Sequence, residues 1–256
     1  IRRIKFSEIT DALFALAFAS IISILNFIRY SATAAYMSLV PRVCLTAHAP
    51  NRLMIHIQGI LWRSGGATGG APTHTAGIAN AFREDNFDVI LAASQKPDCI
   101  RKDIEYIYVP PPSIFLYPAE LDLINFHFES SRCSKNVLQH RNPYFVYARL
   151  APFNFSAVII SRWKNCPLVV EYNGSEVWIS KNWNDRKLKL NWLAFMTEKI
   201  ILKHAHLAIA ISTPLQNELV DRGVPKDRTV IVPNGVDLSG GVLDFDAIKL
   251  LKYSVS

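Results

Sequence analysis

From about residue 52, short apolar runs rich in β-branched and aromatic residues alternate with longer segments whose apolar positions recur at helical spacing. The run at 87–93 is apolar almost throughout, which is typical of a parallel strand covered on both faces. Repeated strand–helix units predict right-handed crossovers and a parallel sheet, so we expect a doubly wound α/β fold. The predicted strands are residues 54–57, 87–93, 106–109, 144–147, 167–172, 207–211 and 229–232.

Helical spacing of apolar residues marks the segments between these strands. The predicted helices are residues 72–83, 118–130, 154–163 and 191–204, with a further helix starting near residue 213. At that start, we expect Thr213 to be the N-cap and Pro214 to be the first helical residue. His204 and His206 lie at the end of the preceding helix, where we expect exposed cations that interact with the helix dipole.

An uncharged and mostly apolar run occupies residues 12–28, ahead of the α/β pattern. It is slightly short for a bilayer span, which needs about 20 residues. A signal peptide or anchor is one interpretation, because basic residues precede the run and small residues follow at 32–34. Glu8 and Asp11 interrupt the basic region and favour the other interpretation, a helix packed on the domain or lying on a membrane surface.

The chain is therefore expected to comprise an N-terminal helical extension (1–50), an α/β domain (51–238) and a tail or truncated start of a further domain (239–256). Half of its residues are hydrophobic and 19% are charged, which allows a sizeable core and disfavours global disorder. The four cysteines lie far apart without histidines at ligand spacing, so we predict no metal site.

The net charge of +7 favours anionic partners, but charge alone does not choose among nucleotide diphosphates, lipid headgroups and nucleic acid. Basic and aromatic residues are not interleaved on one face, and no nucleic-acid-binding motif is present. We therefore predict that the chain does not bind nucleic acid. A basic surface that serves solubility remains the alternative explanation of the charge.

A glycine-rich stretch follows the first predicted strand directly and leads into a helix. Gly65, Gly66, Gly69 and Gly70 would let the backbone approach a ligand closely, and the helix N-terminus would favour an anion. The stretch matches neither a Walker loop nor an in-register G-x-G-x-x-G motif, which disfavours a dinucleotide-dependent dehydrogenase or epimerase. The alternative is an ordinary strand–helix loop without a ligand.

A polar segment follows the strand predicted at 167–172. It consists of Glu171, Tyr172, Asn173, Gly174, Ser175 and Glu176. Ligands of open α/β sheets bind outside the carboxyl ends of the strands, where carboxylates and amides can hydrogen-bond a sugar or act as acid or base. The alternative is an ordinary turn at Asn173 and Gly174, with Glu176 stabilising the start of a following helix.

A third segment, at 232–237, runs from the last strand into the sequence Pro-Asn-Gly-Val-Asp. Taken in this order, the glycine-rich loop with Thr73 and His74, the segment at 171–176 and the segment at 232–237 resemble family 4 glycosyltransferases. The two Rossmann domains of that family form the GT-B fold. The resemblance covers about residues 52–238 and implies a Rossmann-like N-terminal half of a GT-B fold.

The resemblance implies a retaining hexosyltransferase that uses a nucleotide-sugar donor and no obligatory metal. Its other partner would be a sugar or a lipid-linked acceptor, with residues 12–28 available for contact with a membrane surface. The implied location is cytoplasmic, either free or peripheral to the membrane. The N-terminal half would form the acceptor side of the cleft.

The resemblance also assigns site residues. The implied catalytic residues are His74, Asn173 and Glu176, although many relatives carry a histidine where Asn173 stands. Asn173 can form hydrogen bonds but cannot titrate. The implied substrate-binding residues are Gly65, Gly66, Gly69, Gly70, Thr73, Glu171, Tyr172, Gly174 and Asn234.

The donor-binding half of the family, with its E-x7-E element, is not found within this sequence, because only residues 238–256 follow Asp237. We therefore expect the site to be completed by a further segment or a separate chain. The alternative is a non-catalytic binding or partner-docking domain derived from such an enzyme.

Overall fold

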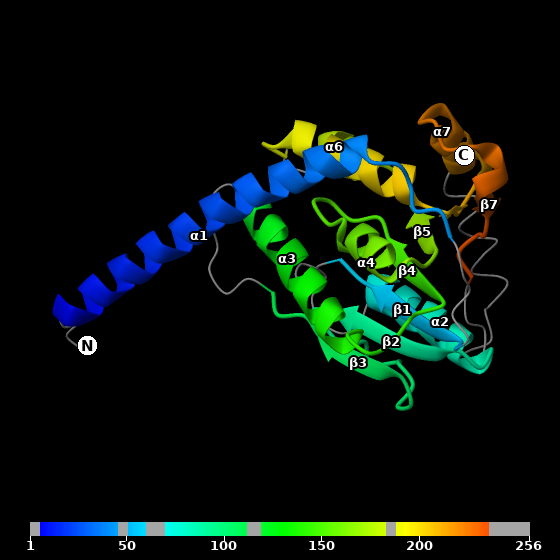
Figure 1. Cartoon of the computed structure of the whole chain (residues 1–256), viewed down its shortest axis with the longest axis horizontal. Coiled ribbons are helices and arrows are strands. Elements are labelled where there is room, and N and C mark those ends of the chain that lie inside the picture. The colour runs from blue at the N-terminus through cyan, green and yellow to red at the C-terminus, as the bar shows by residue number, and fades with distance from the viewer. Residues whose placement is uncertain (1–5, 46–50, 60–69, 112–118, 183–187, 236–256) are drawn as a thin grey trace, which may run out of the picture.

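Seven parallel strands form the central sheet in the order β3-β2-β1-β4-β5-β6-β7 (Figure 1). The computed structural model describes residues 6–45, 51–59, 70–111, 119–182 and 188–235. The strands are β1 (Leu53–Ile57), β2 (Asp88–Ala93), β3 (Glu105–Tyr108), β4 (Phe145–Arg149), β5 (Leu168–Tyr172), β6 (Leu207–Ala210) and β7 (Thr229–Ile231). The strand order reverses between β1 and β4, which confirms the doubly wound, Rossmann-like fold.

Helices cover both faces of this sheet. One face is covered by α3 (Glu120–Val137), α4 (Ser156–Lys164) and α6 (Asn191–His204), and the second half of α1 (Phe6–Leu39) packs against α3 and α6 (Figure 1). The other face is covered by α2 (Gly70–Glu84). The described residues also include the short helices α5 (Glu176–Asn182) after β5 and α7 (Thr213–Asp221) after β6, and a 3-10 turn (Lys226–Arg228) before β7.

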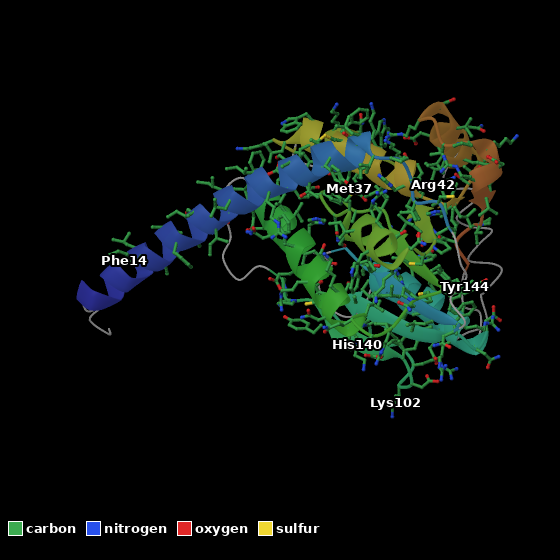
Figure 2. All side chains as sticks on the ribbon, viewed as in Figure 1. Phe14, Met37, Arg42, Lys102, His140 and Tyr144 are labelled. Atoms are coloured by element: carbon green, nitrogen blue, oxygen red, sulfur yellow. The ribbon has the colours of Figure 1, made fainter. Side chains whose placement is uncertain are left out.

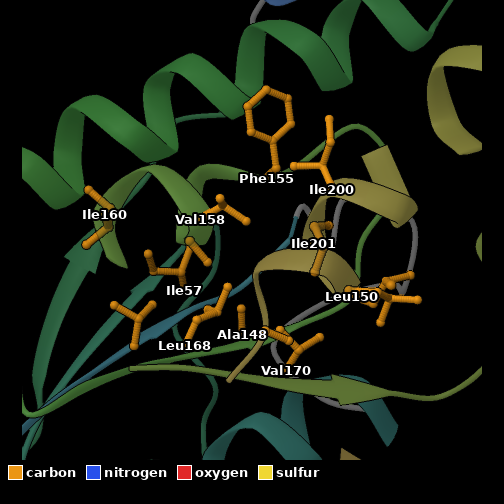
Figure 3. Close-up of a cluster of buried hydrophobic side chains, with 14 of the residues drawn as sticks. Ile57, Ala148, Leu150, Phe155, Val158, Ile160, Leu168, Val170, Ile200 and Ile201 are labelled. Carbon is orange, nitrogen blue, oxygen red and sulfur yellow. The ribbon is translucent and has the colours of Figure 1, made fainter. Parts of the chain in front are cut away.

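Alternation of side chains along each strand produces two separate cores. Ile57, Ala148 and Val170 pack against the helices of the α3–α4–α6 face (Figure 3). Met54 and Leu91 point the other way, against α2. Burial on both faces explains why these strands are continuous apolar runs rather than alternating ones.

The second half of α1 is part of the larger core. Tyr30 is fully buried, and its hydroxyl lies 2.6 Å from Oγ1 of Thr197 in α6. Its ring packs edge-on against His127 of α3, with centroids 5.2 Å apart. This half of α1 therefore packs on the domain, as one of the two interpretations of the N-terminal run expected, whereas the N-terminal half projects away from it (Figure 1).

Two local predictions were wrong. The N-cap of α7 is Ser212 rather than Thr213, so the helix starts one residue earlier than expected. His204 and His206 are not exposed cations, because the chain after α1 crosses the end of α6. The Nε2 atom of His204 lies 2.9 Å from the Met37 carbonyl oxygen, and that of His206 lies 3.1 Å from the Val43 carbonyl. Burial lowers the pKa of both imidazoles.

Burial of His127 makes stability depend on pH. Burial lowers its pKa to about 3, so the folded state holds the neutral imidazole while the unfolded state binds a proton at its ordinary pKa. Stability is therefore retained above about pH 6.5 and falls as the pH drops from there towards 3, by up to about 1.4 kcal/mol per pH unit. We expect His127→Leu to reduce this slope in urea unfolding measured from pH 7 to pH 4.5.

The exposed His140 offers the matched control, because His140→Leu removes an imidazole that the fold does not bury. Its slope should equal that of the wild type. Equal slopes for His127→Leu and the wild type would contradict the assignment of a neutral, buried His127.

Candidate functional site

A buried carboxylate, Glu171, lies at the carboxyl end of β5 and accepts three side-chain contacts. Its Oε2 atom lies 2.8 Å from Nε2 of His74 and accepts a hydrogen bond of 2.7 Å from the Tyr147 hydroxyl. Its Oε1 atom accepts a hydrogen bond of 2.6 Å from the side-chain amide of Asn173. The guanidinium of Arg149 adds a cation, with Nε 3.9 Å from Oε1. We call these five residues the Glu171 cluster.

Sheet topology explains how these residues meet. Strands β4 and β5 are neighbours, and their register pairs Arg149 with Glu171. Tyr147 points to the same face, because it lies two residues before Arg149 in β4. His74 comes from the first turns of α2, which covers this face after β1. The Glu171 cluster therefore lies on the α2 face at the carboxyl edge, close to the point where the strand order reverses.

The carboxylate of Glu171 is held in its ionised form. Burial by itself would raise the pKa of Glu171, but hydrogen bonds from His74, Tyr147 and Asn173 outweigh burial and lower it to about 2. Burial and the neighbouring anion raise the pKa of the Tyr147 hydroxyl, so that group remains a donor. The site thus presents a fixed negative charge surrounded by donors at neutral pH.

A neutral histidine lies beneath the cluster. The ring of His56 in β1 is 4.9 Å from that of Tyr147, in an edge-on arrangement. Burial lowers the pKa of His56 to about 4. Beside it, the Thr75 hydroxyl of α2 donates to the side-chain oxygen of Gln58 at 3.1 Å, which fixes α2 against the end of β1.

The turn after β5 is fixed by a second buried carboxylate. Gly174 has φ of +114°, a conformation that favours glycine. The Ser175 hydroxyl donates to Glu198 of α6 at 2.9 Å and accepts the backbone N–H of Trp178 at 3.2 Å, so it caps α5. Arg222 pairs with Glu198 at 3.0 Å. These contacts fix the backbone between Asn173 and α5.

Of the predicted catalytic residues, His74 and Asn173 lie in the Glu171 cluster. Glu176 lies at the start of α5 and is partly buried. Burial raises its pKa, while the charge of Arg149 opposes this shift. Arg149 therefore interacts electrostatically with both Glu171 and Glu176.

The predicted substrate-binding residues are more scattered. Gly65, Gly66 and Gly69 lie outside the described residues, and Gly70 is the exposed first residue of α2. Thr73 is exposed, and Asn234 is exposed after β7, two strands away from β5. Among the described residues, no hydrogen bond joins Thr73 or Asn234 to the Glu171 cluster.

Tyr172 points away from the other predicted site residues. It is fully buried on the α3–α4–α6 face, and its hydroxyl donates to Glu218 of α7 at 2.7 Å. The alternation of a strand places neighbouring residues on opposite faces, so Glu171 and Tyr172 cannot both face the α2 side.

Sequence reasoning missed Tyr147 and Arg149. A signal was present, because Arg149 is a charged residue at the end of an otherwise apolar strand, where ligands of such sheets bind. Without the pairing of β4 with β5, nothing connected Arg149 to Glu171. Both residues belong to the candidate site.

The sequence profile of Glycosyltransferase Family 4 matches residues 68–239, which is more than half of the chain. The chain belongs to this family. The match includes the start of α2, all five residues of the Glu171 cluster and the segment that contains Asn234. A search among curated proteins found no match.

Solved structures share the fold of this family 4 domain. Sucrose-phosphate synthase from Thermosynechococcus elongatus superposes with a TM-score of 0.55 and 15% identity, over 78% of this chain and 52% of that one. A putative UDP-N-acetylglucosamine 2-epimerase from Listeria monocytogenes has a TM-score of 0.50 and 11% identity, over 77% and 51%. Anabaena HepE in complex with UDP and glucose has a TM-score of 0.46 and 18% identity, over 80% and 50%.

The chain spans about half the length of these structures. At such low identities the similarity shows the fold alone, and it includes both a synthase and a putative epimerase. Together with the family match, it confirms a Rossmann-like, GT-B-type domain of Glycosyltransferase Family 4.

We expect Tyr147→Phe to destabilise the domain, because it removes a hydrogen bond to a buried charge. The expected loss in free energy of unfolding is about 1.5–3 kcal/mol at pH 7, measured by urea unfolding. Tyr108→Phe is the matched control, since Tyr108 is exposed on the edge strand β3 and its change should stay within about 0.5 kcal/mol. Equal effects of the two variants would argue against the hydrogen bond to Glu171.

Proposed function

We propose that this domain forms the acceptor side of a site that transfers a sugar from a nucleotide-sugar donor, with retention at the anomeric carbon and without a resident metal. Membership of Glycosyltransferase Family 4 supports the type of reaction. The observation that carries the site is the Glu171 cluster, which joins His74 of α2 to the end of β5 at the carboxyl edge. A nucleotide sugar and an acceptor hydroxyl are the proposed partners.

Of the paired residues His74 and Glu171, His74 is the one exposed to solvent. Its side chain is 27% exposed, whereas that of Glu171 is almost completely buried. We assign His74 to contact with the acceptor hydroxyl and Glu171 to holding the ring of His74 in place. In the proposed step, the acceptor oxygen bonds to the anomeric carbon, the bond from that carbon to the diphosphate breaks, and the hydroxyl proton leaves with the diphosphate.

Glu176 and Asn173 have different proposed roles. Asn173 donates to Glu171 and therefore acts by positioning that carboxylate rather than as a base. Burial raises the pKa of Glu176, and we propose that its carboxyl group hydrogen-bonds the sugar. A lipid-linked acceptor fits the basic charge of the chain, and contact of residues 12–28 with a membrane would bring such an acceptor close.

The second candidate is a non-catalytic binding or docking domain. The bond from Asn173 to Glu171 favours it, because one of the two N–H donors of this amide is already used inside the protein and the amide cannot act as a base. A domain of this kind would bind the acceptor without transferring sugar. The two candidates differ in turnover, which makes them separable by one assay.

The test is a transfer assay of the full-length protein with a panel of UDP-, GDP- and ADP-linked sugars. Turnover is measured as the release of nucleoside diphosphate. Proton NMR of the product gives the anomeric configuration, which we expect to match that of the donor. His74→Ala should lower kcat/KM by at least about a hundredfold. The exposed His140 gives the control His140→Ala, which should leave kcat/KM unchanged.

An inverted product would exclude retention. Undiminished transfer by His74→Ala would exclude the assigned contact with the acceptor. Acceptor binding without turnover of any donor, measured with the donor-binding segment or chain present, would establish the second candidate.

A further inference from the structure

We propose that the exposed face of α1 and the adjacent outer stripe of α6 dock on a lipid bilayer, with α1 lying in the plane of one leaflet. The purpose of this contact, access to a lipid-linked acceptor, rests on the proposed function. The contact itself follows from exposure, hydropathy and charge. Among the described residues, α1 is the helix that is long and apolar enough to enter a membrane, with a mean hydropathy of 1.8 in the most apolar 18-residue window of Leu13–Leu39.

Residues 13–18, in the N-terminal half of α1, are uncovered on every side. The six consecutive residues from Leu13 to Phe18 are all exposed, and six residues take a helix through more than one and a half turns. No face of this stretch is therefore covered by the domain. Phe14 is 76% exposed, at the far end of the projecting helix (Figure 2).

The packed half of α1 also turns an apolar face outward. Beyond Ser23, its buried side carries Tyr30, Ala34 and Met37. The exposed positions on its outer side are Ile24, Leu25, Ile28, Arg29, Ala32, Ala35, Tyr36, Ser38 and Leu39. Arg29 is the one charged residue among these positions. The outer face of a helix on a water-soluble domain is normally polar, whereas this face is mostly apolar.

The helix beside α1 adds aromatic and basic side chains. The Tyr30–Thr197 and Met37–His204 contacts are seven residues apart in both helices, so α1 and α6 run side by side in the same direction. Within α6, the exposed positions form one stripe, which consists of Trp192, Phe195, Lys199 and Lys203. Tryptophan favours the headgroup region of a bilayer, and lysines nearby attract anionic headgroups.

A hollow beside this stripe can receive such a headgroup. It has a volume of about 600 Å³, and its polar and aromatic lining consists of Ser38 of α1, Phe195, Lys199 and Lys203 of α6, and Asp221, Arg222 and Arg228, so that four cations face one carboxylate. The Lys199 ammonium lies 4.5 Å from the centroid of the Phe195 ring. Basic and aromatic groups therefore lie along the same edge as the apolar face of α1, which gives the charge complementarity that an anionic membrane surface requires.

A bilayer covers this surface better than a second copy of the chain does. A helical partner would cover one stripe of α1 and leave the other apolar sides of residues 13–18 in water. Lipid chains contact a helix in the plane of a leaflet along its inner face and both flanks, so a leaflet covers more of residues 13–18 than one helical partner does. The second half of α1 packs on the domain through Tyr30, Ala34 and Met37, so the free apolar part of the helix is shorter than the about 20 residues that a bilayer span needs. This favours a helix in the plane of one leaflet over one that crosses the bilayer.

The experiment is flotation of the full-length protein with phosphatidylcholine vesicles that contain or lack phosphatidylglycerol. We expect the wild type to float with both and to bind the anionic vesicles more tightly. Phe14→Glu/Leu25→Glu should lower vesicle affinity at least about tenfold, because both side chains are mostly exposed and neither supports the core. Lys199→Ala/Lys203→Ala should weaken binding to anionic vesicles about tenfold and binding to neutral vesicles much less.

The matched control is Lys102→Ala/Tyr108→Glu, which changes the net charge by the same amount at exposed positions near the β3 edge (Figure 2). Its affinity for vesicles should equal that of the wild type. Failure of the wild type to float, or equal losses in this control, would overturn the proposal. Wild-type dimerisation that Phe14→Glu/Leu25→Glu abolishes, without vesicle binding, would overturn it in favour of a second copy.

Transfer to a soluble acceptor, measured on the same samples, separates this proposal from the proposed function. Phe14→Glu/Leu25→Glu should keep that transfer while losing vesicle binding. Vesicle binding by a wild type that turns over no donor would leave the membrane contact supported and the transfer excluded.

Discussion

A charged carboxylate inside a protein must be surrounded by donors, and the candidate site of this domain depends on that constraint. An unpaired buried anion costs several kcal/mol, so Glu171 is stable in its ionised form only while His74, Tyr147 and Asn173 donate to it. These three donors come from a helix, a strand and a turn. The carboxylate therefore fixes the relative positions of three separate parts of the chain, which is the requirement for a preorganised site.

A second buried carboxylate, that of Glu198, fixes the far side of the turn after β5. Glu198 accepts from Ser175 and pairs with Arg222, which also pairs with Glu218 of α7 at 2.9 Å. The turn after β5 is thus held by α6 and α7, while its first residue, Asn173, is held by Glu171. The backbone just before Glu176 is therefore held by two contacts, from Asn173 to Glu171 and from Ser175 to Glu198. These contacts fix Glu176 in its partly buried position.

Helix α1 combines two environments along one apolar sequence. Tyr30 and Met37 face the α3–α4–α6 core, whereas Leu25 and Leu39 face outward at 59% and 82% exposure. Burial of apolar area explains the inner face, but the outer face has no such partner within the described residues. The same helix therefore serves the core of the domain and the proposed contact with a bilayer.

The sequence by itself determined the architecture, because burial on both faces makes each parallel strand a continuous apolar run, such as that of β2, and helical spacing marks the segments between strands. It also pointed to the carboxyl ends of β1 and β5, which brought His74, Glu171 and Asn173 into view. The tertiary structure alone decided that Tyr147 and Arg149 join them, that Tyr172 faces the opposite core, and that His204 is buried. The physical reason is that strand pairing and crossing segments bring together residues distant in sequence, and periodicity within one segment carries no information about its neighbours.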